Sequence, residues 1–176
     1  MPPGEMVDLV NEQDIVIGTA SIRDCLEKGL LHRAVAVLVV RSNGDFLLQQ
    51  RSKRDKWHPA LWTLSSTGHV KAGEAYDEAA ARELREELGI SASLARLGKY
   101  FLPPIQSGGL TEREWVTLYL TRTDKPCSVD REEVEGVREV PASRLRHMFN
   151  DGSMTPDAVI LLSEYLQLRE DAGPGS

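Results

Sequence analysis

The chain has 176 residues, about the length of one compact domain, of which 41% are hydrophobic and 27% are charged. Its 27 Asp and Glu residues outnumber its 21 Lys and Arg residues, which gives a net charge of −6. This charge argues against non-specific binding of a nucleic-acid polymer, because such binding needs a broad basic face.

Only two cysteines are present, Cys25 and Cys127, so we expect no disulfide scaffold and favour a reducing compartment. No apolar run approaches the roughly 18 residues that a membrane span needs. The N-terminal residues lack the basic start and apolar core of a signal peptide. The chain is therefore expected to be cytoplasmic, with no membrane partner.

The first third of the chain predicts strands around one short helix. Two apolar runs separated by polar residues predict a hairpin, after which Ser21 is placed to cap a helix that ends near Gly29. A longer apolar run predicts a buried strand, and the Asn-Gly turn that follows favours a tight hairpin into the next strand. The strands are expected at residues 6–10, 15–20, 32–40 and 46–51.

The rest of the chain predicts two longer helices separated by strands. Residues 75–88 form the strongest helix pattern, with acidic residues in the first turn and Gly89 at the end. A second helix is expected from Thr155 to about Arg169, with Pro156 at its first position. Further strands are expected at residues 61–67, 93–102, 112–120 and 136–140.

This order of elements predicts a mixed α/β or α+β sandwich. No internal repeat or long linker divides the chain, so we expect a single domain over residues 1–170. The last residues, 171–176, are expected to form a disordered tail.

The first of the long helices concentrates carboxylates on one face. Glu83, Glu86 and Glu87 are spaced i, i+3 and i+4, so all three project from the same side. Like charges at this spacing repel by roughly 0.2–0.5 kcal/mol per pair. The cluster becomes favourable when it holds a hard divalent cation, which prefers oxygen ligands. The alternative is an ordinary solvated acidic helix.

The loop before this helix also suits a ligand. Gly68 and Gly73 bracket it, and glycines allow a backbone to approach a ligand closely. Glu74 precedes the helix, where a carboxylate can accept hydrogen bonds from free N–H groups.

With these residues the chain resembles the Nudix hydrolase superfamily. The family signature reads Gly, five residues, Glu, seven residues, then Arg-Glu-aliphatic-any-Glu-Glu-any-Gly-aliphatic. Every position is matched between residues 68 and 90, by Gly68, Glu74, Arg82, Glu83, Leu84, Glu86, Glu87, Gly89 and Ile90. The resemblance implies an α/β/α sandwich with a mixed sheet and a loop–helix–loop catalytic unit.

The resemblance also implies an activity, namely hydrolysis of a small-molecule diphosphate linkage by attack of water on phosphorus with Mg²⁺ or Mn²⁺ as cofactor. Glu83, Glu86 and Glu87 would bind the metal with help from the Gly68 carbonyl. Glu74 and Arg82 would brace the loop and the helix through an ion pair. The general base stays open. Its candidates are Glu86, Glu87, Glu112, Glu114, Glu133 and Glu135, of which we take Glu86, Glu87 and Glu114 as the catalytic set.

A second resemblance is to isopentenyl-diphosphate isomerase, a non-hydrolytic branch of the same fold. It is carried by residues 32–34, 48–51, 61–63 and 68–69. It implies a second metal site formed by His32, His69, Glu112 and Glu114. Glu112 and Glu114 would point to the same face of a strand, as a shared ligand pair requires.

Two positions depart from the isomerase pattern. The isomerase has a cysteine directly before its Gly-His, where this chain has Thr67, whose hydroxyl is too weak an acid and base for that role. The first metal histidine of the isomerase appears here as Cys25. We expect Cys25 to be a buried apolar residue; as a ligand beside the two histidines it would suit zinc better than magnesium.

A basic loop follows the strand expected at 46–51. Four of its residues are cationic, namely Arg51, Lys53, Arg54 and Lys56. Because Arg and Lys both bind phosphate, we expect Arg51 and Lys56 to contact the substrate; a solvated loop is the alternative. The aromatic residues that could contact the organic half of a substrate, or instead belong to the core, are Trp57, His58, Trp62, Trp115 and Tyr119.

Three functional hypotheses follow. The first is a metal-dependent pyrophosphohydrolase. The second is an isopentenyl-diphosphate isomerase relative with altered chemistry. The third is a diphosphate-metabolite sensor without turnover, which the intact acidic cluster argues against. Homodimers are common in the family, so the chain could form one.

Overall fold

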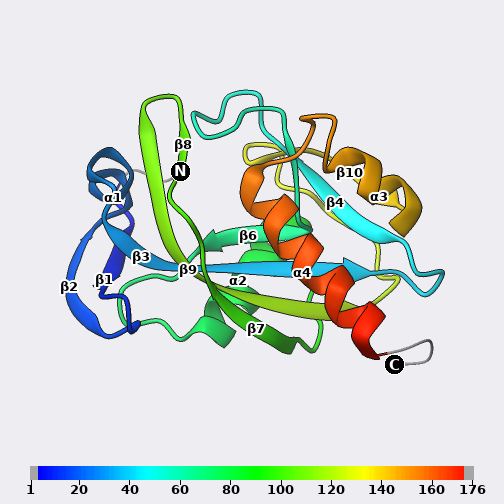
Figure 1. Cartoon of the computed structure of the whole chain (residues 1–176), viewed down its shortest axis with the longest axis horizontal. Helices are drawn as coiled ribbons and strands as arrows, with labels where there is room; N and C mark the ends of the chain where they lie inside the picture. The colour runs from blue at the N-terminus through cyan, green and yellow to red at the C-terminus, as the bar shows by residue number, and fades with distance from the viewer. Residues whose placement is uncertain (1–3, 173–176) are drawn as a thin grey trace.

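The computed structural model describes residues 4–172, and at its centre lies the ten-residue strand β3 (Leu31–Val40). This strand pairs antiparallel with β1 (Met6–Val10), β4 (Phe46–Arg51) and β6 (Ser66–His69). It pairs in parallel with β9 (Leu110–Arg122) along its whole length (Figure 1). The sheet is therefore mixed, as predicted.

The remaining strands extend this arrangement at its edges. β2 (Val16–Ser21) pairs with β1, and β10 (Val134–Val140) pairs with β4. The two-residue strand β5 (Trp62–Thr63) also pairs with β4, while β7 (Ala95–Phe101) and β8 (Ile105–Ser107) pair with β9.

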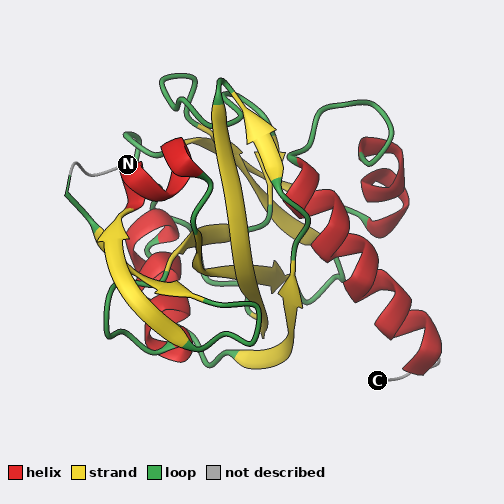
Figure 2. Cartoon of the chain, turned by 60° about the vertical axis from the view of Figure 1, so that its left-hand side comes forward, coloured by secondary structure: helices red, strands yellow, loops and turns green. Residues whose placement is uncertain are grey.

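Helices cover both faces of the sheet, which confirms the predicted α/β/α sandwich. Helix α2 (Tyr76–Leu88) lies behind the sheet in Figure 1, and α4 (Pro156–Ala172) lies in front of it. Side chains alternate along β3, so that Val35 and Val37 pack toward α2 while Ala36 and Leu38 pack toward α4. Each layer thus buries its own apolar cluster. Figure 2 shows helices on both sides of the strands.

The predicted start of the chain is confirmed. The hairpin of β1 and β2 leads into α1 (Ile22–Lys28), whose cap is Ser21, with its hydroxyl oxygen 3.1 Å from the backbone nitrogen of Asp24. Gly29 ends this helix at φ 62°, a left-handed conformation that glycine adopts without strain. Helix α2 also ends at a glycine, Gly89, as predicted.

Other expectations need correction. The single strand expected at 61–67 is two strands, because the chain changes its pairing partner from β4 to β3 between β5 and β6. Helix α3 (Ala142–Met148) and strand β8 were not predicted, since each is too short to show a clear periodicity. Helix α4 continues to Ala172, so the tail does not begin at residue 171; residues 173–176 lie outside the described residues.

Within residues 4–172, no helix is both long and apolar enough to cross a membrane.

Candidate active site

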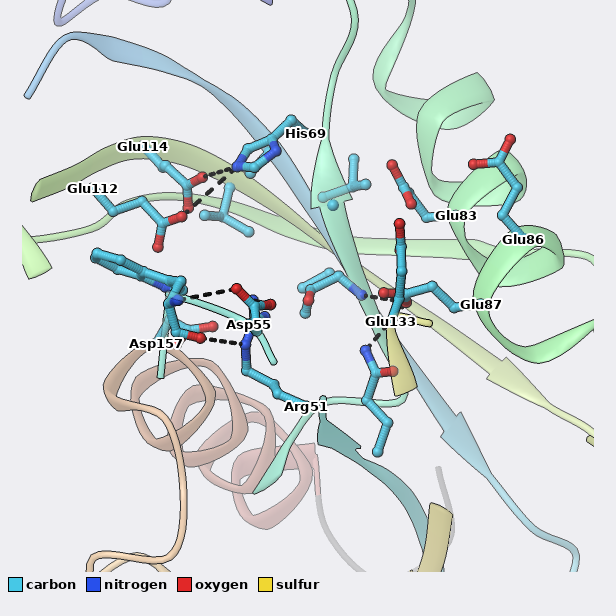
Figure 3. Close-up of a pocket in the computed structure, with 18 of the residues that line it drawn as sticks. Arg51, Asp55, His69, Glu83, Glu86, Glu87, Glu112, Glu114, Glu133 and Asp157 are labelled. Atoms are coloured by element: carbon cyan, nitrogen blue, oxygen red, sulfur yellow. Dashed lines mark hydrogen bonds and ion pairs between the residues drawn. The ribbon is translucent and has the colours of Figure 1, made fainter. Parts of the chain in front are cut away.

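A cavity of about 650 Å³ opens where β4 and β6 leave the central strand (Figure 3). β3 pairs with β4 only at Val39 and Val40 and with β6 at Ala34–Val37, so the two neighbouring strands diverge. Helices α2 and α4 and strand β9 complete the walls. The predicted site residues that line the cavity are Arg51, Gly68, His69, Arg82, Glu83, Glu86, Glu87, Glu112, Glu114 and Glu133.

Helix α2 holds its carboxylates against the cavity because the adjoining face of the helix is anchored in the core. Ala80, Leu84 and Leu88 on that face are buried. Glu83 and Glu87 are buried as well, whereas the Glu86 side chain is 51% exposed at the cavity mouth. The spacing therefore places all three carboxylates on one wall, as the sequence predicted.

Burial changes the acidity of the two inner carboxylates. It raises the pKa of Glu83 to about 7 and the pKa of Glu87 to about 8. Glu87 accepts hydrogen bonds at 3.1 Å from the Gln49 side chain and from the Thr67 backbone N–H. Carboxylates that are costly to ionise in an empty pocket are stabilised when a divalent cation lies between them.

Gly68 lies directly against the acidic wall. A Cβ at this position would lie 2.2 Å from the Glu83 carboxyl carbon and 2.3 Å from its Oε1. Any larger residue here would therefore displace the Glu83 carboxylate from its place against the backbone of β6, although the φ angle is not one that favours glycine.

Arg82 connects the loop to the helix. Its Nε and Nη2 each lie 2.8 Å from one oxygen of Glu74, and Nη1 lies 2.5 Å from Glu83 and 3.2 Å from Glu86. Nη2 also donates to the His69 carbonyl at 3.0 Å. Burial alone would raise the pKa of Glu74, but the hydrogen bonds from Arg82 lower it. The structure thus brings Glu74 and Arg82 together in the bracing pair that the family resemblance implies.

We expect Arg82→Ala to lower the free energy of unfolding by about 2–4 kcal/mol, because it leaves mostly buried carboxylates without their cation. Urea denaturation of the metal-free protein measures this loss. Arg85→Ala is the control, since Arg85 lies on the same helix with its side chain exposed, and it should change stability by less than about 1 kcal/mol. Equal losses in the two variants would contradict the bracing role.

The second cluster predicted from the sequence also assembles. His32 is fully buried on β3, and its Nε2 lies 3.2 Å from Oε1 of Glu114 on the adjacent β9. Nε2 of His69 lies 3.6 Å from Glu114 and 3.7 Å from Glu112. Ligand atoms of His32, His69 and Glu114 all lie within 4.8 Å of one another.

The chemistry of this cluster fits a cation. Nδ1 of His32 lies 2.9 Å from the Leu30 carbonyl and donates to it, so in the neutral ring Nε2 is an acceptor that faces the Glu114 carboxylate. Nε2 has no aligned hydrogen-bond partner among the described residues. Two buried acceptors in contact need a proton or a metal ion between them. Accordingly, although burial opposes ionisation of His32, the neighbouring Glu114 raises its pKa.

Cys25 is a core residue, as predicted. It is fully buried with Val7, Ile22 and Leu26, and burial raises the pKa of its thiol to about 11. In the described part of the chain, its sulfur is not among the clustered ligand atoms. The zinc-thiolate arrangement is therefore not formed.

The basic loop differs from the expectation in one respect. Arg51 lines the cavity, donating from Nε to the Trp57 carbonyl at 2.9 Å and pairing with Asp55 at 2.5 Å. Lys56 is exposed and does not line the cavity, whereas Arg54 does. The prediction of Lys56 as a substrate contact is thus not supported, because the loop turns its side chain outward.

Of the aromatic residues and the remaining acidic candidate, some line the cavity and others lie outside it. Trp57 is buried and lines the cavity. Trp62 packs against the core, Trp115 stacks on Phe101, and Tyr119 is buried beneath α2, so none of the three lines the cavity. Glu135 pairs with Lys53 outside it.

Sequence reasoning missed several cavity residues, among them Glu5, Asp55 and Asp157. Glu5 lies with its Oε1 3.8 Å from Nδ1 of His69, and Asp55 and Asp157 line the far side of the cavity. Each is a single acidic residue in an irregular segment or a first helical turn, where no local pattern marks it as part of a site.

Comparison with known proteins identifies the family. The model of the NUDIX domain matches residues 30–158. The chain belongs to the NUDIX family. The Nudix resemblance noted in the sequence is thereby confirmed, as is the expected class of enzyme, a Nudix-type pyrophosphohydrolase.

Among individual Nudix relatives, the chain is similar to both branches recognised in its sequence. It is 36% identical over 148 residues to isopentenyl-diphosphate Delta-isomerase 2 of Photorhabdus laumondii, covering 84% of this chain and 83% of that protein. It is 31% identical over 163 residues to an uncharacterized Nudix hydrolase of Pseudomonas aeruginosa, covering 92% and 94%. The crystal structure of DR0079 from Deinococcus radiodurans shares the fold, with a TM-score of 0.77 at 24% identity over 91% of this chain and 98% of that one.

Proposed function

We propose that this Nudix protein is a divalent-metal-dependent hydrolase that cleaves a diphosphate linkage in a small molecule by attack of water on phosphorus. The observation that carries the proposal is the complete acidic wall of the cavity. Glu83, Glu86 and Glu87 line it together, and Gly68 leaves no side chain between the strand and Glu83.

In this proposal each group of cavity residues has a role that follows from its position. Glu83, Glu86 and Glu87 would hold Mg²⁺ or Mn²⁺, which when bound would supply the positive charge that neutralises a diphosphate and lowers the pKa of a water molecule. Arg51 and Arg54, on the wall across the cavity, bind phosphate oxygens. The candidates for the general base that also line the cavity are Glu86, Glu87, Glu112, Glu114 and Glu133; Glu135 does not.

A specific observation supports a second metal site in the same cavity. The unpartnered Nε2 of His32 and the facing carboxylate of Glu114 suit a cation that His69 and Glu112 could also bind. This set keeps an isomerase-like reaction as the second candidate function, in line with the isomerase named among the relatives. Thr67 argues against the isomerase reaction, because a threonine hydroxyl cannot exchange a proton with carbon as a cysteine thiol can.

A panel of diphosphates tests the proposal. We expect the protein with Mg²⁺ to release monophosphate products from at least one nucleotide, dinucleotide or sugar diphosphate, and EDTA to abolish the release. Deuterium uptake into isopentenyl diphosphate without hydrolysis would instead establish the isomerase. Thermal stabilisation by a diphosphate without turnover, even with Mn²⁺, would favour a sensor.

A further inference from the structure

The cavity has two chemically different ends. Glu83, Glu86 and Glu87 form one end, and Figure 3 shows Glu112 and Asp157 on the side away from them. Trp57, Val116 and Leu161 also line the cavity, so apolar surface lies among its charged groups. A diphosphate held by the acidic wall would therefore direct its organic half toward Glu112 and Asp157.

Asp157 reaches this end from the first turn of α4. It lies four residues before Leu161, so the two share one face of the helix, and both line the cavity. The neighbouring residue Ala158, like Leu162, is fully buried in the core, which fixes the orientation of the turn. Asp157 is thus positioned by packing and does not lie on a mobile surface.

Few positive charges are free to neutralise the carboxylates there. Burial raises the pKa of Asp157, and burial together with Glu114 and Asp157 raises the pKa of Glu112 well above its ordinary value. A hydrogen bond from Thr155 opposes the shift at Asp157, and Arg51 opposes both shifts, but it shares its positive charge with Asp55 and so neutralises these carboxyl groups only in part. Carboxyl groups in this position are stabilised by a ligand that donates hydrogen bonds.

A hydrocarbon ligand would have the opposite effect. Filling this end with an isoprenoid chain would remove water from Asp157 and Glu112 and return no hydrogen bond, which is unfavourable. Hydroxyl or amino groups would replace the lost water, while Trp57 and Leu161 would pack against the faces of the same moiety.

We propose that Asp157 is the specificity residue for the organic half of the substrate, accepting hydrogen bonds from its hydroxyl or amino groups and excluding a hydrocarbon chain. The proposal rests on the proposed function in that it takes the cavity to bind a diphosphate. It goes beyond that function by assigning the choice of organic group to a residue outside the Nudix signature, and it separates this chain from enzymes of isopentenyl diphosphate.

Equilibrium binding tests the proposal without requiring turnover. The probes are ADP-ribose, which is rich in hydroxyl and amino groups, geranyl diphosphate, whose organic half is a hydrocarbon, and pyrophosphate, which lacks an organic half. All three are titrated calorimetrically with Ca²⁺ present. We expect the wild-type protein to bind ADP-ribose more tightly than geranyl diphosphate.

Variants of Asp157 should change this preference in a defined way. Asp157→Leu should weaken ADP-ribose binding by about tenfold or more, the loss expected for a charge-assisted hydrogen bond. It should tighten geranyl diphosphate binding and leave pyrophosphate within about twofold. Asp157→Asn, which keeps an acceptor oxygen, should show a smaller loss. Glu164→Leu, at an exposed position of the same helix, should match the wild type.

The outcomes separate this proposal from simpler explanations. If Asp157 only stabilises the N-terminus of α4, Asp157→Leu will lower the melting temperature and leave the ratio of the two affinities unchanged, which overturns the proposal. The proposal is also overturned if the wild-type protein binds geranyl diphosphate more tightly than ADP-ribose, or binds the two with equal affinity. A changed ratio in a protein that hydrolyses no diphosphate with Mg²⁺ would refute the proposed hydrolysis but support the role of Asp157.

Discussion

Replacing Glu87 by Gln should lower kcat/KM for any hydrolysed diphosphate by a factor of about 10³ or more while the protein stays folded. Gln has nearly the same shape and can still accept the Thr67 N–H hydrogen bond, but it removes the charge from the most buried part of the acidic wall. Steady-state kinetics with Mg²⁺ measure the effect. Glu164→Gln, at an exposed position, is the control and should match the wild type. Near-normal turnover by Glu87→Gln would show that the site assignment is wrong.

Stability measurements on the same variant separate loss of charge from loss of fold. The pKa of Glu87 is raised to about 8 in the folded protein from 4.5 in the unfolded chain. Ionisation therefore costs the folded state stability progressively as the pH rises from about 4.5 to 8. In EDTA, Glu87→Gln should be more stable than the wild type at pH 8, by on the order of 1–3 kcal/mol, and the gain should vanish below pH 4.5. If Glu87→Gln is instead less stable than the wild type at pH 8, its kinetic defect comes from loss of the fold and not from loss of the charge.

Gly68→Ala should lower kcat/KM by about 10², because the added methyl group cannot fit without moving Glu83. The new carbon would lie 2.2 Å from the Glu83 carboxyl carbon, so the side chain must shift by an ångström or so, and displacements of about 1 Å can cost two orders of magnitude in rate. The affinity for Mn²⁺, measured by titration, should fall as well.

Gly136→Ala is the matched control for this substitution. A Cβ at Gly136 on β10 would meet no atom within 4 Å, so its activity and Mn²⁺ affinity should be unchanged. If Gly68→Ala retained wild-type values of both, the close approach of Glu83 to β6 would not matter for catalysis.

The local parts of the site could be predicted from the sequence because they lie within one short segment. The spacing of Glu83, Glu86 and Glu87 on a helix fixes their common face, and Gly89 marks the end of that helix. The spacing of Glu112 and Glu114 on a strand likewise places both on one face. These inferences need only the period of a helix or a strand.

The end of the cavity that contains Asp157 could not be predicted in this way. Asp157 and Glu112 line the same cavity only because α4 packs across the sheet, an arrangement that no local pattern encodes. The loop between β4 and β5 contains His58 and Ala60 at positive φ, a conformation that is uncommon for residues other than glycine. Its path, which turns Lys56 outward and Arg54 toward the cavity, is therefore set by tertiary contacts.

The pairing of β3 with β6 and β9 bears on how this enzyme could change its substrate during evolution. Val35 is paired with Gly68, Ala34 with His69, and His32 with Glu114, so hydrogen-bonded registers hold the chemical groups at fixed spacings on three adjoining strands. Two of the residues near the proposed place of the organic half, Trp57 and Asp157, come instead from an irregular loop and from the first turn of α4. If Asp157 selects the organic group as proposed, we expect mutations in those two segments to alter substrate choice while the strand registers preserve the geometry of the acidic wall, so that specificity and bond cleavage can evolve separately.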